Sequence, residues 1–216
     1  LAPCPRCRRA LAADTPPPSL CQDCQTTLGL PQAGLQGHRP LPWWALGWYD
    51  DDLRHLLLRL RPDPRPDLIE ALAALLSQRL VRNRSWQDQL QGREPLLVAI
   101  PSWKRRSNPI PGLLSAALAP RLAGRERILL ERSRPTLGQH HLNRALRQSN
   151  QQGSFAVQGP APSRDHAVVL IDDILTSGAT AGAAAAALEQ RGWSMVGLVC
   201  LARTPRRQER SPWAMV

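Results

Sequence analysis

The stretch that decides the fold is "VVLIDDILTSGAT", residues 168–180. It runs from four aliphatic residues, typical of a buried strand, through two adjacent carboxylates, Asp172 and Asp173, to a small hydroxylated turn around one glycine. In a parallel α/β sheet, ligands bind beyond the carboxyl ends of the strands, where the following helices begin. The stretch therefore predicts a strand, a ligand-binding turn and a helix at one edge of such a sheet.

The turn is suited to hold a phosphate. Backbone N–H groups at a helix N-terminus converge on an anion, glycine allows close approach and hydroxyls add donors, and the residues concerned are Thr176, Ser177, Gly178, Ala179 and Thr180. Asp172 and Asp173 are acceptors, so they suit sugar hydroxyls or a metal ion beside the phosphate. A 5-phosphorylated ribose satisfies both halves. The simpler alternative, an Asx-type turn that only caps a helix, would need one acid and one small residue.

Hydrophobic periodicity predicts alternating helices and strands after residue 50. The expected elements are, in order, helices at 50–60 and, with Asp67 as N-cap, at 67–82, a strand at 96–100, a helix near 112–122, a short strand at 127–130, a polar mobile loop at 131–154, a strand at 168–171, a helix at 180–191 and a strand at 195–201. This order predicts an α/β fold with a Rossmann-like parallel sheet and helices on both faces.

Four of the five cysteines lie near the start of the chain with the spacing C-x2-C-x13-C-x2-C, at Cys4, Cys7, Cys21 and Cys24. Two C-x2-C pairs complete a closed tetrahedral thiolate site, which favours a structural Zn2+. Two disulfides are the alternative, and they conflict with the reducing cytoplasm that we expect for a chain without a secretory signal. We therefore predict a zinc module at residues 1–40 and a main domain at residues 41–216.

The formal charge of +11 and the pI of about 11.1 favour a polyanionic partner, either nucleic acid or a phosphorylated metabolite. Almost all of this charge is arginine, Lys104 being the only lysine, and such a bias can equally reflect the nucleotide composition of a genome. Trp43, Trp44 and Trp48 flank the cysteine segment, and we expect them to pack between this segment and the main domain rather than to form a stacking platform for single-stranded DNA. The most apolar stretch, residues 183–188, is too short to cross a bilayer, so we expect no membrane insertion.

Residues 168–180 match, without a gap, the motif with which type I phosphoribosyltransferases bind 5-phosphoribosyl 1-pyrophosphate (PRPP). A four-cysteine module, an aromatic segment ending in Tyr49, a Leu-rich helix and an "IP" strand end before a basic loop add to this motif. So does the pattern R-x-R-x-T-x-x-Q-x-x-L-x(4)-R-x-x-N-x(4)-F, present as Arg132, Arg134, Thr136, Gln139, Leu142, Arg147, Asn150 and Phe155. Over most of its length the chain resembles the ComF family, competence-associated proteins with an N-terminal zinc-ribbon module and a type I phosphoribosyltransferase fold.

The resemblance implies a Mg2+-dependent transferase, linked to natural competence and DNA uptake, in which a nitrogen nucleophile attacks C1 of PRPP and pyrophosphate leaves. Asp172 and Asp173 are then expected to hold the ribose hydroxyls and to orient Mg2+. Candidates for the pyrophosphate are Ser102, Lys104, Arg105 and Arg106, and Arg132, Arg134 and Arg147 are expected to close over the site as a lid. For each of these arginines taken singly, a solvated basic face is an equally good interpretation. The adjacent His140 and His141 are expected to be exposed.

Three features depart from the family pattern. No further C-x-x-C pair follows the first two, so one metal site is expected. The R-G-F-N element that frames the pyrophosphate is not recognisable in "RRSNPIPGLLSA", and Arg59 or Arg61 stands in place of a lysine at the end of the Leu-rich helix. A second hypothesis therefore stays open, a non-catalytic PRPP-sensing protein whose zinc module and Arg-rich surface bind single-stranded DNA or a protein of the competence machinery.

Overall fold

The structure, a computed structural model, describes residues 2–16, 18–102, 108–133, 154–163 and 165–205. Its helices are α1 (Gln22–Thr27), α2 (Asp51–Leu60), α3 (Pro66–Val81), α4 (Arg84–Leu90), α5 (Ile110–Arg121) and α7 (Ala179–Gln190). Its strands are β1 (Leu35–Gly37), β2 (Trp43–Trp48), β3 (Glu94–Ala99), β4 (Arg125–Glu126), β5 (Leu130–Arg132), β6 (Phe155–Val157), β7 (His166–Leu175) and β8 (Met195–Arg203).

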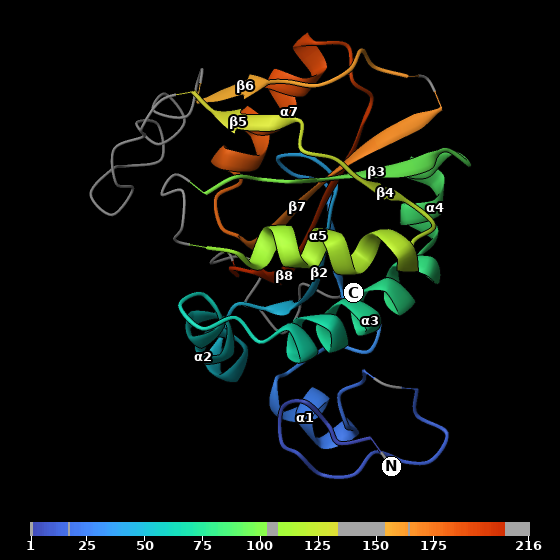
Figure 1. Ribbon diagram of the computed structural model, residues 1–216, viewed down its shortest axis with the longest axis vertical. Helices are drawn as coiled ribbons and strands as arrows, with labels where there is room; N and C mark the ends of the chain where they lie inside the picture. Colours follow the sequence, from blue (N-terminus) through green and yellow to red (C-terminus); the bar gives the residue numbers. More distant parts are fainter. Residues whose placement is uncertain (1, 17, 103–107, 134–153, 164, 206–216) are drawn as a thin grey trace.

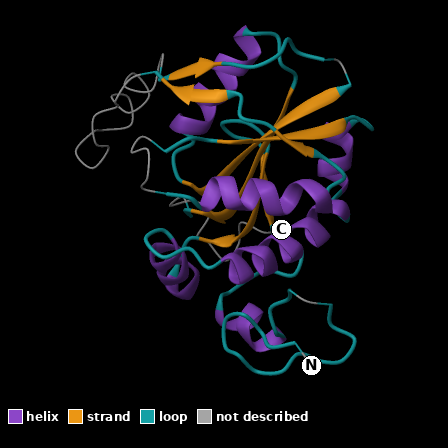
Figure 2. Cartoon of the chain, viewed as in Figure 1, coloured by secondary structure: helices purple, strands orange, loops and turns teal. Residues whose placement is uncertain are grey.

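A six-stranded sheet with the order β1-β2-β8-β7-β3-β4 forms the centre of the molecule (Figures 1 and 2). Strand β1 runs antiparallel to β2, and every other neighbouring pair is parallel. Strands β5 and β6 form a separate antiparallel pair beside α7. The predicted α/β fold is confirmed, and the topology places the carboxyl ends of β2, β8, β7 and β3 along one edge of the sheet.

Successive side chains of a strand point to opposite faces of the sheet, and in the central strands the side chains on both faces are apolar. Helices therefore cover both faces. Val169 and Ile171 of β7 belong to the core beneath α3 and α5. Val168 and Leu170 belong to the core beneath α7. The central strands are therefore almost continuous aliphatic runs, which is the pattern that identified residues 168–171 as a strand.

Several element boundaries differ from those expected. Strand β7 continues through both acids to Leu175, because its pairing with β8 extends four residues beyond its pairing with β3. Helix α3 starts one residue before Asp67, with Arg65 as N-cap and Pro66 in the first turn, where its fixed φ is favourable. The single strand expected at 127–130 is replaced by β4 and β5, which lie on either side of residues 127–129. Strands β1, β2 and β6 and helices α1 and α4 were not predicted.

The cysteine-containing segment around α1 packs against α2 and α3 (Figure 1). Its buried leucines share one apolar core with these helices, and they are Leu11, Leu20, Leu28 and Leu30. A domain boundary at residue 40 stays a prediction, although β1, which precedes it, already pairs with the sheet. Among the described residues, no helix is both long and apolar enough to cross a membrane.

Candidate functional site

The turn between β7 and α7 is shaped by Gly178. This residue caps α7 with a φ of 82°, a backbone conformation that side chains other than glycine rarely adopt. A Cβ atom at this position would lie 2.4 Å from Cγ of Pro40, so the turn also packs closely against the segment before β2. The hydroxyl of Ser177 accepts a hydrogen bond of 3.3 Å from the N–H of Ala179, at the first turn of the helix. Local sequence therefore builds the open helix N-terminus that an anion site requires.

A buried arginine that sequence reasoning missed supports this turn from below. Arg203, the last residue of β8, donates through Nη1 to the carbonyl of Leu175 at 3.0 Å and also to the carbonyl of Thr176. Its guanidinium carbon lies 5.4 Å from the centre of the Trp43 ring. In a trans peptide the C=O and N–H point in opposite directions. Because both carbonyls face Arg203, the N–H groups of Thr176 and Ser177 point away from it and are free of the sheet.

The two acids have different surroundings, although they are neighbours in sequence. Asp173 is 2% exposed, and its Oδ2 accepts a hydrogen bond of 2.7 Å from Nε of Arg61, the residue that ends α2. Partial burial disfavours the charged guanidinium, but the hydrogen bond and charge of Asp173 raise the pKa of Arg61 above its ordinary value. The structure thus selects Arg61, and not Arg59, as the cation at the end of the Leu-rich helix that faces the acids.

Asp172 keeps some solvent exposure and lies beside Cys200 of β8. Side chains alternate along a strand, so Asp172 continues the row of Leu170 on the α7 side of the sheet. Its Oδ1 accepts a hydrogen bond of 2.8 Å from the N–H of Asp173. Burial, followed by the charge of Asp173, raises the pKa of Asp172 well above its usual range. Of the two acids, Asp172 is the one that can reach a ligand in solution.

Arg132 completes the described part of this edge. Its Nε donates to the carbonyl of Pro101, just beyond β3, at 3.0 Å, and its guanidinium lies 4.3 Å above the Phe155 ring. Burial lowers the pKa of Arg132, and the nearby charge of Asp172 acts in the opposite direction. The contacts with Pro101 and Phe155 hold Arg132 at the base of the β5–β6 pair, close to the acids.

The remaining predicted site residues are distributed unevenly. Ser102 is partly exposed at the same edge, one residue after Pro101. The predicted pyrophosphate ligands Lys104, Arg105 and Arg106, the predicted lid arginines Arg134 and Arg147, and His140 and His141 lie outside the described residues. The pyrophosphate site and the lid therefore stay predictions.

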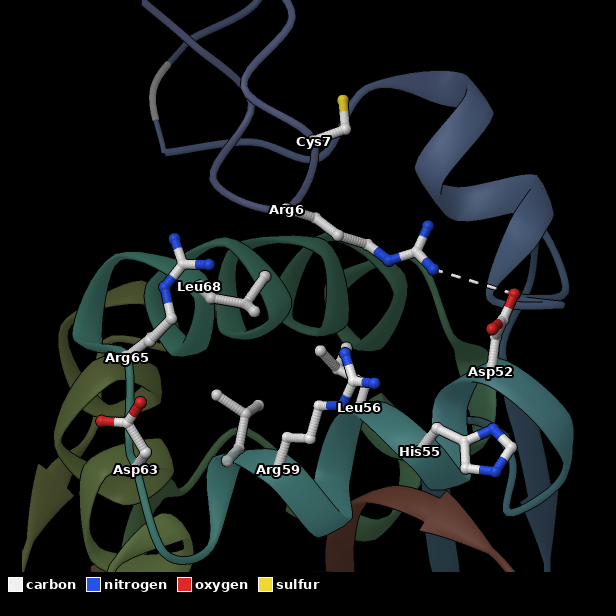
Figure 3. Close-up of a pocket in the computed structure, with 10 residues that line it drawn as sticks. Arg6, Cys7, Asp52, His55, Leu56, Arg59, Asp63, Arg65 and Leu68 are labelled. Atoms are coloured by element: carbon white, nitrogen blue, oxygen red, sulfur yellow. Dashed lines mark ion pairs between the residues drawn. The ribbon is translucent and has the colours of Figure 1, made fainter.

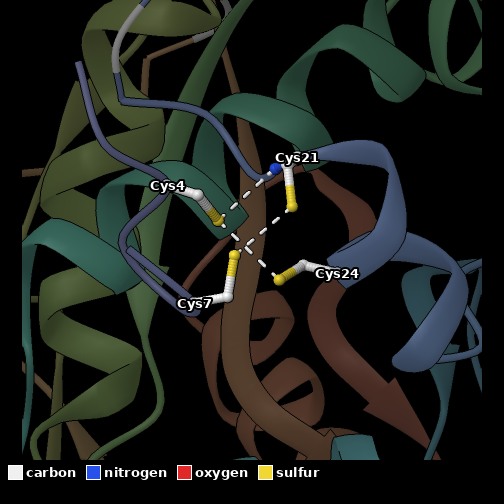
Figure 4. A group of neighbouring side chains, drawn as sticks. All are labelled: Cys4, Cys7, Cys21 and Cys24. Carbon is white, nitrogen blue, oxygen red and sulfur yellow. Dashed lines mark hydrogen bonds between the residues drawn. The ribbon is translucent and has the colours of Figure 1, made fainter. Parts of the chain in front are cut away.

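The four cysteines of the N-terminal segment converge on one point (Figure 4). Sγ of Cys4 lies 3.7 Å from Sγ of Cys24, and Sγ of Cys7 lies 3.6 Å from Sγ of Cys21. A tetrahedral site with metal–sulfur bonds of about 2.3 Å separates its sulfur atoms by roughly 3.8 Å, whereas a disulfide needs about 2.05 Å. Burial would raise the pKa of Cys4, but backbone N–H groups outweigh it and lower that pKa to about 6, whereas burial raises the pKa of Cys24 to about 12. The cluster can hold one metal ion.

The amino-acid sequence is similar to a known domain family and to two named proteins. The phosphoribosyl transferase domain family model matches residues 73–215. The DNA utilization protein YhgH of Salmonella typhimurium strain LT2 is 32% identical over 216 residues, which cover 93% of this chain and 90% of the relative. The protein of the same name from Escherichia coli K12 is 30% identical with the same coverage.

The chain belongs to the ComF family of phosphoribosyltransferase-domain proteins.

Two solved structures also resemble this ComF protein. An adenine phosphoribosyltransferase from Leishmania donovani gives a TM-score of 0.44 at 17% identity, with 81% of this chain and 77% of that chain covered. A hypoxanthine phosphoribosyltransferase from Staphylococcus aureus gives a TM-score of 0.36 at 13% identity, with 66% and 76% covered.

Two tryptophans that the sequence drew attention to are packing residues in this ComF protein. Trp43 and Trp44 are buried, at 5% and 3% exposure, and lie on opposite faces of β2. The Trp44 ring meets Trp86 of α4 edge to face at 5.2 Å, and its Nε1 donates to Oδ1 of Asn83 at 3.3 Å. Both residues therefore pack in the interior, Trp44 in the core that also holds the buried leucines of the cysteine module and Trp43 in the core on the α7 side, and neither offers a free face to a nucleobase.

Proposed function

We propose that this protein binds PRPP at the carboxyl edge of the sheet and transfers its phosphoribosyl group to a nitrogen nucleophile. The observation that carries the proposal is the Gly178 turn, which follows directly on a strand bearing two acids. A ligand with a phosphate at one end and ribose hydroxyls at the other matches this order of donors and acceptors. The phosphoribosyl transferase domain match supports the same interpretation.

Each described residue has a role in this proposal. Backbone N–H groups and hydroxyls of residues 176–180 bind the 5-phosphate, and Arg203 keeps the carbonyls of the turn away from it. Asp172 accepts hydrogen bonds from the ribose hydroxyls. Asp173 is already engaged by Arg61, so it acts mainly by positioning that guanidinium and the strand end. Ser102 is proposed for the pyrophosphate, together with three residues outside the described part of the chain, Lys104, Arg105 and Arg106.

Mg2+ is the metal that this donor set suits. It prefers oxygen ligands and is usually held by one or two carboxylates together with substrate phosphates. Asp172 is a partly exposed carboxylate beside the proposed phosphate turn, so it fits that requirement. When bound, Mg2+ would neutralise charge on the pyrophosphate.

In the proposed reaction, the nitrogen of the acceptor forms a bond to C1 of PRPP while the bond from C1 to the pyrophosphate oxygen breaks. The electron pair of the broken bond leaves with pyrophosphate, whose charge the basic residues after β3 offset. The protein contributes mainly position and electrostatics, because the leaving group is already activated. Arg132 and the residues that follow it are proposed to shield the site from water.

A second role in handling DNA is proposed on a separate observation. Two relatives that are 32% and 30% identical are named DNA utilization proteins, and this chain carries a formal charge of +11. Such a charge favours association with the phosphate backbone of nucleic acid. A link with DNA uptake and with proteins of the competence machinery is proposed on the same basis. A structural Zn2+ is proposed on a different observation, the clustering of the four cysteine sulfur atoms.

The transferase proposal is tested by incubating the protein with PRPP, Mg2+ and a panel of nucleobases and amines, while pyrophosphate release is measured. We expect release that falls at least about 100-fold in Asp172→Asn and stays within twofold in Asp88→Asn, an exposed acid on α4. PRPP binding without pyrophosphate release would instead favour the sensing hypothesis. Absence of PRPP binding in calorimetry would contradict both.

The DNA proposal is tested separately by the salt dependence of oligonucleotide affinity. Specific handling of single strands predicts tighter binding to single-stranded than to duplex DNA at the same salt, with a steep loss of affinity as salt rises. Affinity equal to that of an unrelated basic protein of the same net charge would contradict it.

A further inference from the structure

Two cavities lie between the cysteine module and the helices beside it, and their linings differ in charge. One, of about 600 Å3, is bounded by Arg6 of the module and by α2 and the start of α3 (Figure 3). Its lining holds acids, Asp52 and Asp63, as well as cations, and Arg6 lies 3.7 Å from Asp52. Arg65 is paired with Asp67, which lies outside the lining, at 2.8 Å. This cavity is largely neutralised by its own lining, so it has little selectivity for a charged ligand.

The other cavity, of about 760 Å3, lies between α1 and the C-terminal half of α3, and its lining contains no acid. Its volume is within the range of small-molecule sites. The lining side chains are two arginines, five carboxamides, one hydroxyl and three apolar groups, namely Arg79, Arg82, Gln22, Gln25, Gln32, Gln78, Asn83, Thr26, Leu30, Leu75 and Ala33. Cations and hydrogen-bonding amides without a compensating carboxylate are suited to an anion that also carries donors and acceptors.

The two arginines of this cavity lack acidic partners. Among the described residues, neither Arg79 nor Arg82 forms an ion pair. Nη1 of Arg79 donates to the carbonyl of Leu46 at 2.9 Å, at the point of β2 that β1 does not cover. Its Nε is buried and has no hydrogen-bond partner within the part of the chain that the structure describes. Burial without a counter-charge also lowers the pKa of Arg79 to about 10.

Helical spacing gathers these groups on facing surfaces. Leu75, Gln78, Arg79 and Arg82 are at positions i, i+3, i+4 and i+7 of α3 and its C-cap, so they share one side of that helix. Gln22, Gln25 and Thr26 share one side of α1 in the same way. The side chain of Asn83, which also lines the cavity, is held in place by two hydrogen bonds of 2.9 Å, one to the side chain of Gln36 and one from the N–H of Trp86. The cavity is therefore lined by ordered elements.

We propose that the cavity between α1 and α3 is a second ligand site, which binds a nucleotide through its phosphate and its base. Arg79 and Arg82 bind the phosphate through charge-assisted hydrogen bonds, in which the phosphate takes the place of an acidic side chain as their partner. The carboxamides of Gln22, Gln32 and Gln78 face the base, whose edges offer paired donors and acceptors to amide groups. The same chemistry is presented by a free mononucleotide and by one unit of a single-stranded nucleic acid. The site shares no residue with the Gly178 turn.

The test compares two arginines that differ in place but not in charge. Arg82→Gln removes a cation from the cavity, and Arg84→Gln removes an exposed cation from the neighbouring helix α4, outside the cavity. Calorimetry with the four ribonucleoside monophosphates, a (dT)10 oligonucleotide and inorganic phosphate is performed in a Ser177→Ala/Thr180→Ala background, which weakens the phosphate turn. We expect saturable nucleotide binding that weakens about five- to tenfold in Arg82→Gln and less than twofold in Arg84→Gln.

The arms of the experiment also identify the source of the ligand. Tighter binding of a monophosphate indicates a free metabolite, and tighter binding of (dT)10 indicates a strand. Equal losses in the two arginine variants, inorganic phosphate binding as tightly as the nucleotides, or no saturable binding would overturn the proposal. PRPP binding by the Arg82→Gln variant with an intact turn should stay within twofold, so failure here is distinguishable from failure of the transferase proposal.

Discussion

At the scale of single residues, the two adjacent acids of β7 illustrate how one strand position separates two roles. Asp173 faces the core side of the sheet, is buried and is neutralised by Arg61 at 2.7 Å. Asp172 faces the opposite side, and its pKa is raised by burial and by the charge of Asp173. A carboxyl group whose charged form is disfavoured by its surroundings is typical of functional sites, where some stability is sacrificed for binding.

Replacing Asp172 by Asn is therefore expected to stabilise the free protein at neutral pH while weakening PRPP binding. Because the folded-state pKa is raised, ionisation of Asp172 costs stability once the pH exceeds the unfolded value of about 3.9. Removing that cost should add about 1–2 kcal/mol, or roughly 2–8 °C in Tm. The Asn side chain keeps an oxygen that can accept from the N–H of Asp173.

The measurement is a series of thermal melts of both proteins between pH 3.5 and 8. The Tm advantage of Asp172→Asn should be absent near pH 3.5 and should grow as the pH rises. Asp88→Asn on α4, at an exposed position, should follow the wild-type curve. An advantage that is independent of pH would show that the charge of Asp172 is not its cause.

At the scale of elements, the connection from β7 to α7 depends on one glycine. Gly178 has a positive φ and lies against Pro40. Gly182, four residues later in the same helix, has open space around it, and a Cβ atom added there would have no neighbour within 4 Å. The two glycines therefore separate the requirement of the turn from the general effect of glycine in a helix.

We expect Gly178→Ala to destabilise the protein by about 1–3 kcal/mol, because alanine is strained at this φ and its Cβ would meet Pro40. It should also weaken PRPP binding at least tenfold, since the N–H groups of the turn would be displaced. Gly182→Ala should be neutral or stabilising by up to about 1 kcal/mol, because alanine favours a helix interior. Chemical denaturation and calorimetry measure the two effects. Equal stability of the two variants would contradict this account of the turn.

At the scale of the whole molecule, the cysteine module and the sheet domain are coupled through a common apolar core. Leu11, Leu20, Leu28 and Leu30 of the module lie in the same cluster as the buried residues of α2 and α3. Helix α2 also links the two regions, because Asp52 near its start lies 3.7 Å from Arg6 and Arg61 at its end binds Asp173. Loss of order in the cysteine module should therefore disturb the position of α2 and, through Arg61, of Asp173.

Removing the metal site is expected to lower the stability of the entire chain. Purified protein should carry one zinc per chain, and Cys21→Ser/Cys24→Ser should carry none. Its Tm should fall by about 10 °C or more, because metal binding contributes directly to folding free energy. Cys200→Ser is the control, since Cys200 is buried in β8 away from the cluster and should leave the zinc content unchanged. Metal analysis and thermal melts test both points, and wild-type protein without zinc would contradict the metal assignment.

Much of this organisation was predictable from local sequence. Three features can be recognised from a few neighbouring residues, because backbone conformation and ligand spacing are local properties. They are the aliphatic run at 168–171, the turn around Gly178 and the spacing of the four cysteines. The amphipathic helix beginning after Asp50 was predicted on the same ground and is confirmed as α2. The sequence left two candidates, Arg59 and Arg61, for the cation at the end of this helix. Only the ion pair with Asp173 in the folded protein identifies Arg61.

Other features were decided only when distant segments met. Strand β2 contains Trp43 and Trp44 and does not resemble an alternating strand. Its edges pair with β8 and β1, and its two faces are buried because Trp44 packs in the core beneath α3 and α5 and Trp43 in the core beneath α7. Arg203 ends an apolar strand and takes its role from carbonyls 27 and 28 residues away in sequence. The sequence by itself therefore determined the turn around Gly178, the spacing of the four cysteines and the fold class. Tertiary structure alone decided which acid is neutralised, which arginine supports the turn and where α1 and α3 enclose a cavity, because these depend on which side chains long-range strand and helix packing brings together.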